Sequence, residues 1–241
     1  MVKKERLDKL IASQGMLSRN DVKSMAKKGE IVVNGVVIKD CSFKVSYDDD
    51  IKIKGKSLEK SQFVYIMINK PKGVVSASED RRDKTVVDIL PDELKRKYLF
   101  PAGRLDKDTT GFSLITDDGD FAHRILSPSR HVDKTYIAKV SEKIDFEYAQ
   151  KAFKEGVVLG DGTVLLSADL HLIENGEKPV FKVIIKEGKY HQVKRMFASL
   201  GTKVIELKRI AIGGLALDEN LKEGEARIIT PDELAMIENV K

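Results

Sequence analysis

The densest group of chemically competent residues lies in the segment Gly103-Arg-Leu-Asp-Lys-Asp-Thr-Thr-Gly111. Glycines bracket this segment and the apolar run Phe112 to Ile115 follows it, which predicts a tight turn ahead of a buried strand. Asp106 lies two residues from Arg104, and a nearby cation favours the ionised form of a carboxyl group. An ionised carboxylate in such a turn can act as a nucleophile or as a general base.

Further carboxylates nearby raise the alternative of a metal site, because hard cations take oxygen ligands. These carboxylates are Asp108, Asp117, Asp118 and Asp120. Asp and Gly also form turns by themselves, and we interpret the last three in that way. The histidines His123, His131 and His171 lack metal-ligand spacing, and Cys41 is the only cysteine. We therefore predict neither a metal site nor a cofactor.

A second motif overlaps the same loop. Asp106-Lys-Asp108-Thr-Thr110 fits the D-x-D-x-T nucleophile loop of haloacid-dehalogenase-like phosphatases. Those enzymes need a buried strand before the first Asp, whereas Phe100-Pro-Ala-Gly-Arg-Leu105 contains a proline and a glycine that disfavour a central strand. Asp117-Asp118 also follows too closely to supply their later acidic pair. We interpret this match as accidental, and a phosphatase stays an alternative to be tested.

The chain has the composition of a soluble globular protein. It contains 241 residues, of which 41% are hydrophobic and 34% charged, enough for a small domain joined to a larger one. Apolar stretches such as Val64 to Ile68 fall far short of the roughly 20 residues of a membrane helix, and Met1-Val-Lys-Lys opens no signal peptide. With a single cysteine, these features predict a cytoplasmic protein without membrane contact.

Positive charge is concentrated in the first quarter of the chain. Residues 1–60 contain 14 Lys and Arg against 9 Asp and Glu, while residues 61–241 contain 29 of each kind. This asymmetry indicates a basic module that binds a polyanion, attached to a neutral body with another task. Surface lysines that only maintain solubility are the alternative.

The basic segment predicts two short helices and a hairpin. Leu7, Leu10 and Ile11 follow helical spacing, and Ser18-x-x-Asp21 begins a second helix with a capping-box pattern. Two β-branched runs then flank Asn34-Gly35, which is a strong signal for a hairpin turn. These elements together predict a compact unit.

This unit resembles the S4 RNA-binding domain. The resemblance is carried over residues 3–50 by Arg6-Leu-Asp-Lys-Leu-Ile11, Ser18-Arg19 and Ile31-Val-Val-Asn-Gly35. It implies binding to structured RNA, with phosphate contacts from five basic residues, namely Arg6, Lys9, Arg19, Lys23 and Lys28. Such contacts give affinity with little sequence choice. The alternative is a merely solvated helix face.

The rest of the chain predicts an α+β domain with a mixed, largely antiparallel sheet flanked by helices, because its elements do not alternate as βαβ units. We expect an S4-like domain at 1–60, with a linker at 55–61, and a catalytic domain at 61–241. Strands are predicted at 63–68, 112–116, 135–140, 180–186, 203–209 and 226–229, and helices at 119–126, 145–154, 190–200 and 231–239.

The larger domain resembles pseudouridine synthases, in particular the RsuA-like branch of the RsuA/RluB family. Four ordered motifs carry this resemblance: Asn69-Lys-Pro-Lys-Gly73, Gly103-Arg-Leu-Asp106 with Asp108-Thr-Thr-Gly111, Lys134-Thr-Tyr136, and Glu187-Gly-Lys-Tyr-His-Gln-Val-Lys-Arg-Met-Phe197. Together with the S4-like segment they cover nearly the whole chain. A lone G-R-L-D would be weak evidence, whereas the ordered set is specific.

The resemblance implies a role for each matching residue. Asp106 would be the carboxylate that attacks the nucleoside, so that uracil leaves C1′, turns and rejoins through C5. Tyr136 would stack on the uracil and relay the C5 proton. Lys194 would pair with Asp106, and Arg104 would contact the nucleotide phosphate or hold the loop. For Arg195 we expect an RNA phosphate or a structural carboxylate, because it projects about 100° from Lys194 on a helix.

The resemblance also implies a target. Tyr190-His-Gln-Val-Lys-Arg195 is typical of the small-subunit branch, since large-subunit relatives tend to carry Asn at the Tyr position and Arg at the Lys position. We therefore expect a monomer that modifies 16S rRNA at uridine 516. A synthase for 23S rRNA and a non-catalytic RNA-binding protein of ribosome assembly remain alternatives. For His191 we expect a structural hydrogen bond rather than general-base chemistry.

Overall fold

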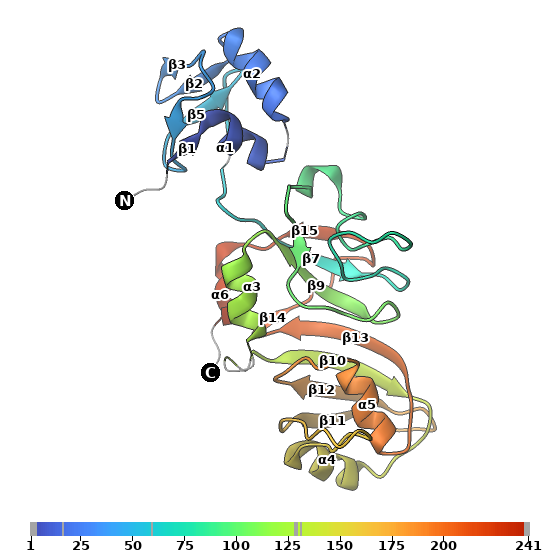
Figure 1. Cartoon of the computed structure of the whole chain (residues 1–241). Coiled ribbons are helices and arrows are strands. Elements are labelled where there is room, and N and C mark those ends of the chain that lie inside the picture. The colour runs from blue at the N-terminus through green and yellow to red at the C-terminus, as the bar shows by residue number, and fades with distance from the viewer. Residues whose placement is uncertain (1–3, 16, 59, 128–129, 131, 239–241) are drawn as a thin grey trace. The chain divides into compact units, whose positions relative to one another are not determined.

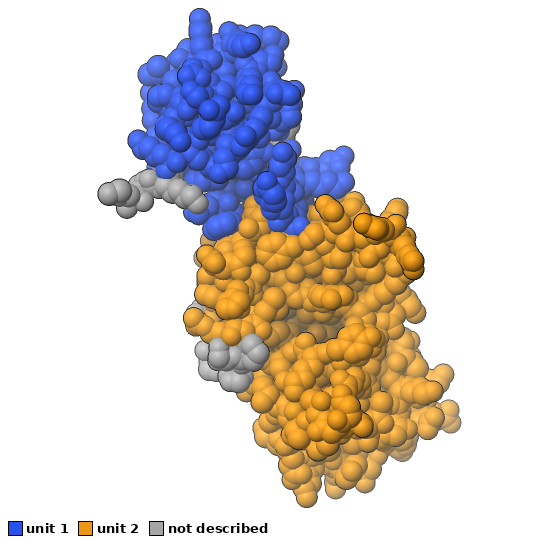
Figure 2. Space-filling view, in the orientation of Figure 1, with its two compact units in different colours: residues 1–64, 91–99 blue, residues 65–90, 100–241 orange. Residues whose placement is uncertain are grey.

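The computed structural model describes residues 4–15, 17–58, 60–127, 130 and 132–238 (Figure 1). The chain forms two compact units. The first unit contains residues 1–64 and 91–99, and the second contains residues 65–90 and 100–241 (Figure 2). No helix in the described ranges is long and apolar enough to cross a membrane.

The first unit contains the two helices and the hairpin that the sequence predicts. Its elements are β1 (Glu5–Arg6), α1 (Leu7–Ser13), α2 (Arg19–Lys27), β2 (Ile31–Val33), β3 (Val36–Val37), β4 (Lys44–Val45), β5 (Ile51–Ile53) and β6 (Lys56–Ser57). Ser18 and Asp21 form the predicted capping box at the start of α2. Asn34 and Gly35 turn between β2 and β3 with φ of 49° and 82°, as a type I′ hairpin turn requires.

The predicted linker at 55–61 was wrong for its central residues. Strand β6 pairs with β5, in a sheet of strand order β3-β2-β5-β6. Leu58 is buried in the core of the first unit, beside Leu7 and Ile31. Glu59 lies outside the described residues. Strand pairing and burial therefore make this polar stretch part of the first unit rather than a connection.

A segment distant in sequence completes the first unit. Pro91–Leu99 includes the 3₁₀ turn η1 (Asp92–Leu94) and packs with this unit, although it falls within the range 61–241 of the expected catalytic domain. Arg96 Nε donates a hydrogen bond to the Ser13 carbonyl, 2.8 Å away. Gly15, with φ of +89°, lies so close to this segment that an added Cβ would be 2.3 Å from the Lys95 carbonyl oxygen.

The second unit is built on one long sheet. Its elements are β7 (Tyr65–Lys70), β8 (Phe100–Pro101), β9 (Thr110–Thr116), α3 (Gly119–Leu126), β10 (Lys134–Val140), α4 (Phe146–Glu155), β11 (Asp169–Glu174), β12 (Val180–Ile185), α5 (Gln192–Ser199), β13 (Val204–Ile212), β14 (Leu215–Ala216), β15 (Ala226–Ile228) and α6 (Pro231–Glu238). The main strand order is β11-β12-β10-β13-β9-β7-β15. The pair β9–β13 is parallel and the other pairs are antiparallel, which confirms the predicted α+β class with a mixed, largely antiparallel sheet.

The parallel pair divides the sheet into two halves with separate cores. Helices α4 and α5 cover the half β11-β12-β10-β13, where Phe153, Phe181 and Phe197 are buried together. Helices α3 and α6 contribute to the other core, which contains Phe112 and Phe121. Figure 1 shows these helix pairs at opposite ends of the unit. The two halves therefore meet along β9 and β13.

Most predicted elements are confirmed, and the differences have local causes. Edge strand β11 was missed because Leu170 is its only fully buried residue, so hydrophobic alternation is weak. Helix α5 begins at Gln192 rather than at residue 190, because His191 adopts a left-handed conformation with φ of 49°. Helix α6 is described to Glu238, so the predicted end at residue 239 lies outside the described residues.

Gly111 sits where the two halves meet. It pairs with Arg209 across β9 and β13, has φ of +96°, and an added Cβ would lie 2.2 Å from the Arg209 carbonyl oxygen. We expect Gly111→Ala to lower the free energy of unfolding by at least about 2 kcal/mol, because strain and a backbone clash combine. Urea unfolding followed by circular dichroism measures the change.

Gly119→Ala is the matched control. Gly119 is the first residue of α3, and a Cβ added there would meet no atom within 4 Å. We expect a change within about 0.5 kcal/mol. Equal stability of the two variants would contradict the tight approach of the two strands.

Candidate active site

Asp106 lies in a loop that leads from β8 to β9. The loop is held to the segment after β7 by backbone contacts: Gly73 N–H donates to the Lys107 carbonyl at 2.8 Å, and Leu105 N–H donates to Ser76 Oγ at 3.0 Å. Gly103 adopts φ of +93°, which a residue with a side chain rarely does. The loop therefore presents Asp106 from a fixed backbone.

Lys70 holds the same loop through hydrogen bonds to its backbone. Its side chain is fully buried, and its ammonium donates to the carbonyls of Pro71, Lys107 and Thr109, at 2.8 Å in the last case. Burial lowers the pKa of Lys70 to about 8, against the opposing effect of nearby carboxylates. The motif Asn69-Lys-Pro-Lys-Gly73 is thus the physical support of the Asp106 loop.

Two basic side chains from the start of α5 contact Asp106. Lys194 Nζ lies 2.9 Å from Asp106 Oδ2, and His191 Nε2 lies 3.3 Å from Asp106 Oδ1. The Asp106 side chain is 24% exposed, so solvent only partly screens these contacts. Lys194 also donates to Asp108 Oδ1 at 2.6 Å and so bridges two carboxylates.

The bridge keeps both partners in their charged forms. Burial alone would lower the pKa of Lys194, but hydrogen bonds to Asp106 and Asp108 outweigh burial, and the pKa is raised. The hydrogen bond from Lys194 likewise lowers the pKa of the Asp108 carboxyl group. Lys194 therefore holds a positive charge 2.9 Å from the Asp106 carboxylate.

Tyr136 is the buried aromatic residue that lines the site beside Asp106. It lies in the middle of the sheet on β10, on the face that Ala138 and Val140 also occupy, and is 7% exposed. Tyr136, Asp106 and Arg104 line one small cavity of about 60 Å³, which we call the inner cavity. This volume holds a few water molecules. Three of the four predicted catalytic residues line it directly, and Lys194 joins through Asp106.

Arg104 and Arg195 are placed differently. Arg104 is exposed and lines both the inner cavity and a larger one beside it. Arg195 follows Lys194 on α5 but turns away and pairs with Asp161, a structural carboxylate. The 100° offset between successive helical residues explains why these neighbours face different partners.

The partner of His191 could not be found from the sequence. The sequence led us to expect a structural hydrogen bond without naming its partner, and the structure places the His191 ring against Asp106. Its left-handed backbone, with φ of 49° and ψ of 34°, precedes α5 without any side-chain cap. No spacing rule would find this conformation. The only available signal was proximity to Lys194 in the chain.

Family models match both units. The model described as RNA pseudouridylate synthase matches residues 64–199. The S4 domain model matches residues 5–51. A Bacillus subtilis protein named uncharacterized RNA pseudouridine synthase YtzG is 42% identical over 235 residues, covering 96% of this chain and 98% of the relative.

A Vibrio cholerae protein named ribosomal small subunit pseudouridine synthase A is 42% identical over 233 residues, covering 96% of this chain and 99% of the relative. The chain belongs to the RsuA-like RNA pseudouridine synthases. A solved structure described as a pseudouridylate synthase matches this synthase with a TM-score of 0.66 and 37% identity, covering 97% of this chain and 99% of the other. The enzyme thus isomerises uridine in RNA and carries an S4 domain.

The competing interpretations of the acidic loop receive no support from the geometry. Asp118 caps α3 by accepting from the Phe121 N–H and also accepts from the Tyr65 hydroxyl at 2.6 Å. Within the described ranges, no three His, Cys, Asp or Glu residues gather as a metal site would require. The chain before Asp106 forms only the two-residue strand β8, not the buried parallel strand of a phosphatase. His131 lies outside the described residues.

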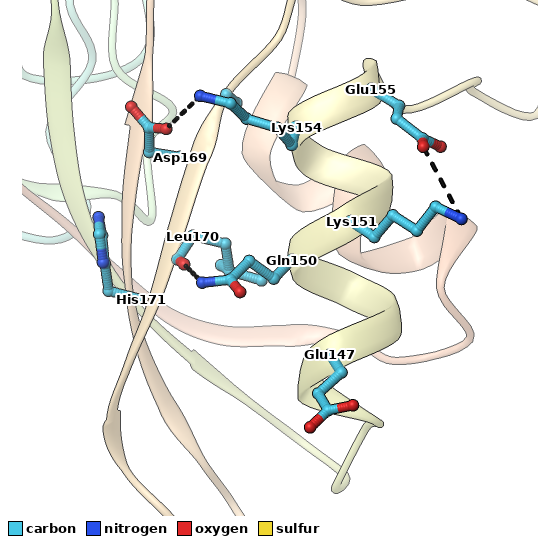
Figure 3. A pocket seen from close by; sticks show the side chains of 9 residues that line it. Glu147, Gln150, Lys151, Lys154, Glu155, Asp169, Leu170 and His171 are labelled. Carbon is cyan, nitrogen blue, oxygen red and sulfur yellow. Dashed lines mark hydrogen bonds and ion pairs between the residues drawn. The ribbon is translucent and has the colours of Figure 1, made fainter.

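A separate hollow of about 460 Å³ lies between α4 and β11 (Figure 3). Its walls carry ion pairs, including Lys154 to Asp169 at 3.4 Å and Lys151 to Glu155 at 3.9 Å. Gln150 donates to the Leu170 carbonyl across it. None of the residues that surround Asp106 contributes to its lining, so it is distinct from the synthase site.

The predicted RNA contacts of the S4 domain divide into two groups. Arg6 is paired with Asp8 at 3.0 Å and Lys9 with Glu5 at 3.0 Å, at the start of α1. Arg19 and Lys23 on α2 and Lys28 just after it are exposed. The second group presents its charge to solvent on one short helix.

Lys134 should make the folding stability of this synthase depend on pH. Its side chain is 7% exposed, and burial with help from Arg209 lowers its pKa from 10.5 to about 8. Below pH 8 the amine is protonated in both folded and unfolded chains, so the cost of the buried charge is fully present. Between pH 8 and 10.5 only the unfolded chain holds that proton, so stability rises with pH, by up to roughly 3 kcal/mol.

We expect Lys134→Met to remove this contribution. The stability gained by the variant over the wild type, measured as the free energy of unfolding, should therefore be larger at pH 7 than at pH 10. Urea unfolding at both pH values measures this difference. The pH-dependent contribution of Lys70 is the same in both proteins and therefore cancels in the comparison. Parallel pH profiles for the two proteins would contradict a charged, buried Lys134.

Proposed function

We propose that this synthase converts one uridine of the small-subunit 16S rRNA, uridine 516, into pseudouridine in the cytoplasm, acting as a monomer. The observation that carries the catalytic part is the ion pair of Asp106 with Lys194 beside the cavity lined by Tyr136. The target is supported by the name of the Vibrio cholerae relative, which matches both units, and by the Tyr190 to Arg195 motif.

Asp106 begins the reaction. Its carboxylate attacks the nucleoside, at C1′ or at the base, and the bond from C1′ to N1 breaks. The detached uracil turns within the site and C5 bonds to C1′, while the bond to Asp106 breaks and returns the free carboxylate. C5 then loses its proton and N1 gains one. Covalent participation divides a difficult glycosidic cleavage into easier steps. The half-buried site limits water, which would otherwise hydrolyse the intermediate.

Tyr136 and Lys194 assist from two sides. The Tyr136 ring at the inner end of the cavity stacks on the extruded uracil, because every base presents a π face to an aromatic side chain. Its hydroxyl relays the C5 proton. Lys194 pairs with Asp106 and holds its carboxylate in position, and Arg104 binds the phosphate of the target nucleotide at the cavity entrance.

Pseudouridine mapping tests the target and the nucleophile together. Total RNA from cells lacking this protein is compared after complementation with wild type or with Asp106→Asn. We expect one pseudouridine of 16S rRNA to disappear and to return only with wild type, because an amide is neither nucleophile nor base. Loss of a 23S site would contradict the small-subunit target. An unchanged map would favour a non-catalytic assembly protein.

Asp108→Asn is the matched control, since Asp108 shares Lys194 with Asp106. We expect this variant to restore the modification, with a rate in vitro within about tenfold of wild type, because Lys194 keeps its contact with Asp106. Complete inactivity of Asp108→Asn together with full activity of Asp106→Asn would exchange the roles of the two carboxylates. Phosphate release that requires Mg²⁺ and Asp106 would favour the phosphatase alternative.

The S4 domain supplies binding energy through phosphate contacts by Arg6, Lys9, Arg19, Lys23 and Lys28. We expect the double variant Arg19→Glu with Lys23→Glu to bind rRNA at least about tenfold more weakly. The slope of log affinity against log salt should fall by about two, one for each lost phosphate contact. Filter binding across a salt series measures both quantities.

The control is Lys52→Glu with Lys56→Glu, which changes the net charge equally on strands β5 and β6 of the same domain. A specific face on α2 predicts a smaller effect for this control. Equal losses in the two double variants would indicate that total charge alone, and not the α2 face, determines affinity.

A further inference from the structure

Tyr190 is an exposed aromatic side chain at the mouth of the active site. Its side chain is 76% exposed, although it belongs to the same segment that carries Lys194. Its ring lies parallel to the His191 ring, with centroids 3.8 Å apart and planes 20° apart. One face of Tyr190 is therefore covered by His191, while the high exposure leaves the rest of the ring open to solvent.

The His191 ring of this pair is held against the active site. His191 Nε2 contacts Asp106 Oδ1 at 3.3 Å, and the left-handed backbone of His191 sets the direction in which the imidazole leaves the chain. Tyr190 is thus tied to the catalytic carboxylate through one intervening ring. A rigid aromatic surface costs little conformational entropy when a partner binds.

A second cavity adjoins the inner one at this point. This outer cavity measures about 670 Å³ and is lined among others by Ser76, Arg104, Lys107, Lys189, Tyr190 and His191. It shares Arg104, Asp106, Lys189 and His191 with the inner cavity. Its volume falls within the range of about 300–1,000 Å³ typical of small-ligand sites. The three cations Arg104, Lys107 and Lys189 outnumber the two carboxylates of the lining, Asp106 and Asp108, which Lys194 also bridges. A positive lining with one open aromatic face suits a nucleotide, which combines a phosphate with a π face.

We propose that Tyr190, backed by His191, is the platform on which the nucleotide next to the target uridine stacks in the outer cavity. The proposal rests on Asp106 as the catalytic carboxylate. When the target uracil enters the inner cavity, its neighbour in the chain comes to lie beside Asp106, and Tyr190 receives that base. The enzyme then selects a uridine partly through the unstacking of its neighbour.

Tyr190→Ala and Tyr190→Phe test the platform. The RNA is a fragment around whichever uridine the mapping identifies, so failure of the 16S assignment leaves this test intact. We expect Tyr190→Ala to raise KM about tenfold with a smaller change in kcat, the size expected for one lost base stack. Tyr190→Phe keeps the ring and should stay near wild type. Tyr148→Ala, an exposed tyrosine on α4, is the matched control.

An abasic nucleotide separates stacking from a purely structural role. Two RNAs carry an abasic site, one 5′ and one 3′ of the target uridine. We expect one of them to raise KM for wild type and to remove most of the difference between wild type and Tyr190→Ala. If the Tyr190→Ala penalty is the same on intact and both abasic RNAs, the platform is overturned. A penalty confined to kcat, or one shared by Tyr190→Phe, would also overturn it.

Discussion

The short parallel contact between β9 and β13 is the constraint on which the site depends. It joins two halves with separate cores through two registered pairs, Lys208 with Thr110 and Arg209 with Gly111. Strand β9 begins where the Asp106 loop ends, so the loop lies at the junction. Side chains from both halves therefore meet at the site. The half with β7 and β9 supplies the loop and Lys70, and the half with β10 and β13 supplies Tyr136 and α5. A glycine is required there because the backbones approach so closely.

The lysines around this junction differ in how strongly they hold their proton. Lys70 and Lys134 are buried and lose part of their preference for the protonated form. Lys194, partly exposed and bridging two carboxylates, instead has its protonated form stabilised. Lysines of the second unit therefore either donate hydrogen bonds to the backbone from buried positions or hold a positive charge beside Asp106. Burial and the number of carboxylate partners decide between these roles.

Local signals in the sequence predicted what depends on local physics. The Ser18 and Asp21 cap, the Asn34-Gly35 turn and the apolar spacing of α5 each act over a few residues, so they identified their elements. Motif order identified the family and led us to expect Asp106 as its carboxylate. Long-range packing decided the rest: Pro91–Leu99 joins the first unit through Arg96, and the αL backbone of His191 directs its ring to Asp106. Neither feature leaves a periodic pattern, which is why both were missed.

The small size of the inner cavity has a consequence for how the enzyme chooses among uridines. At about 60 Å³ the space beside Tyr136 is much smaller than the outer cavity of about 670 Å³, so a base that reaches Tyr136 lies close to the side chains that line it. The free energy for extruding the base from its stack comes from contacts with the remainder of the RNA. Free nucleosides and short oligonucleotides lack those contacts. The narrow space beside Tyr136 thus favours a uridine whose flanking RNA also contacts the enzyme.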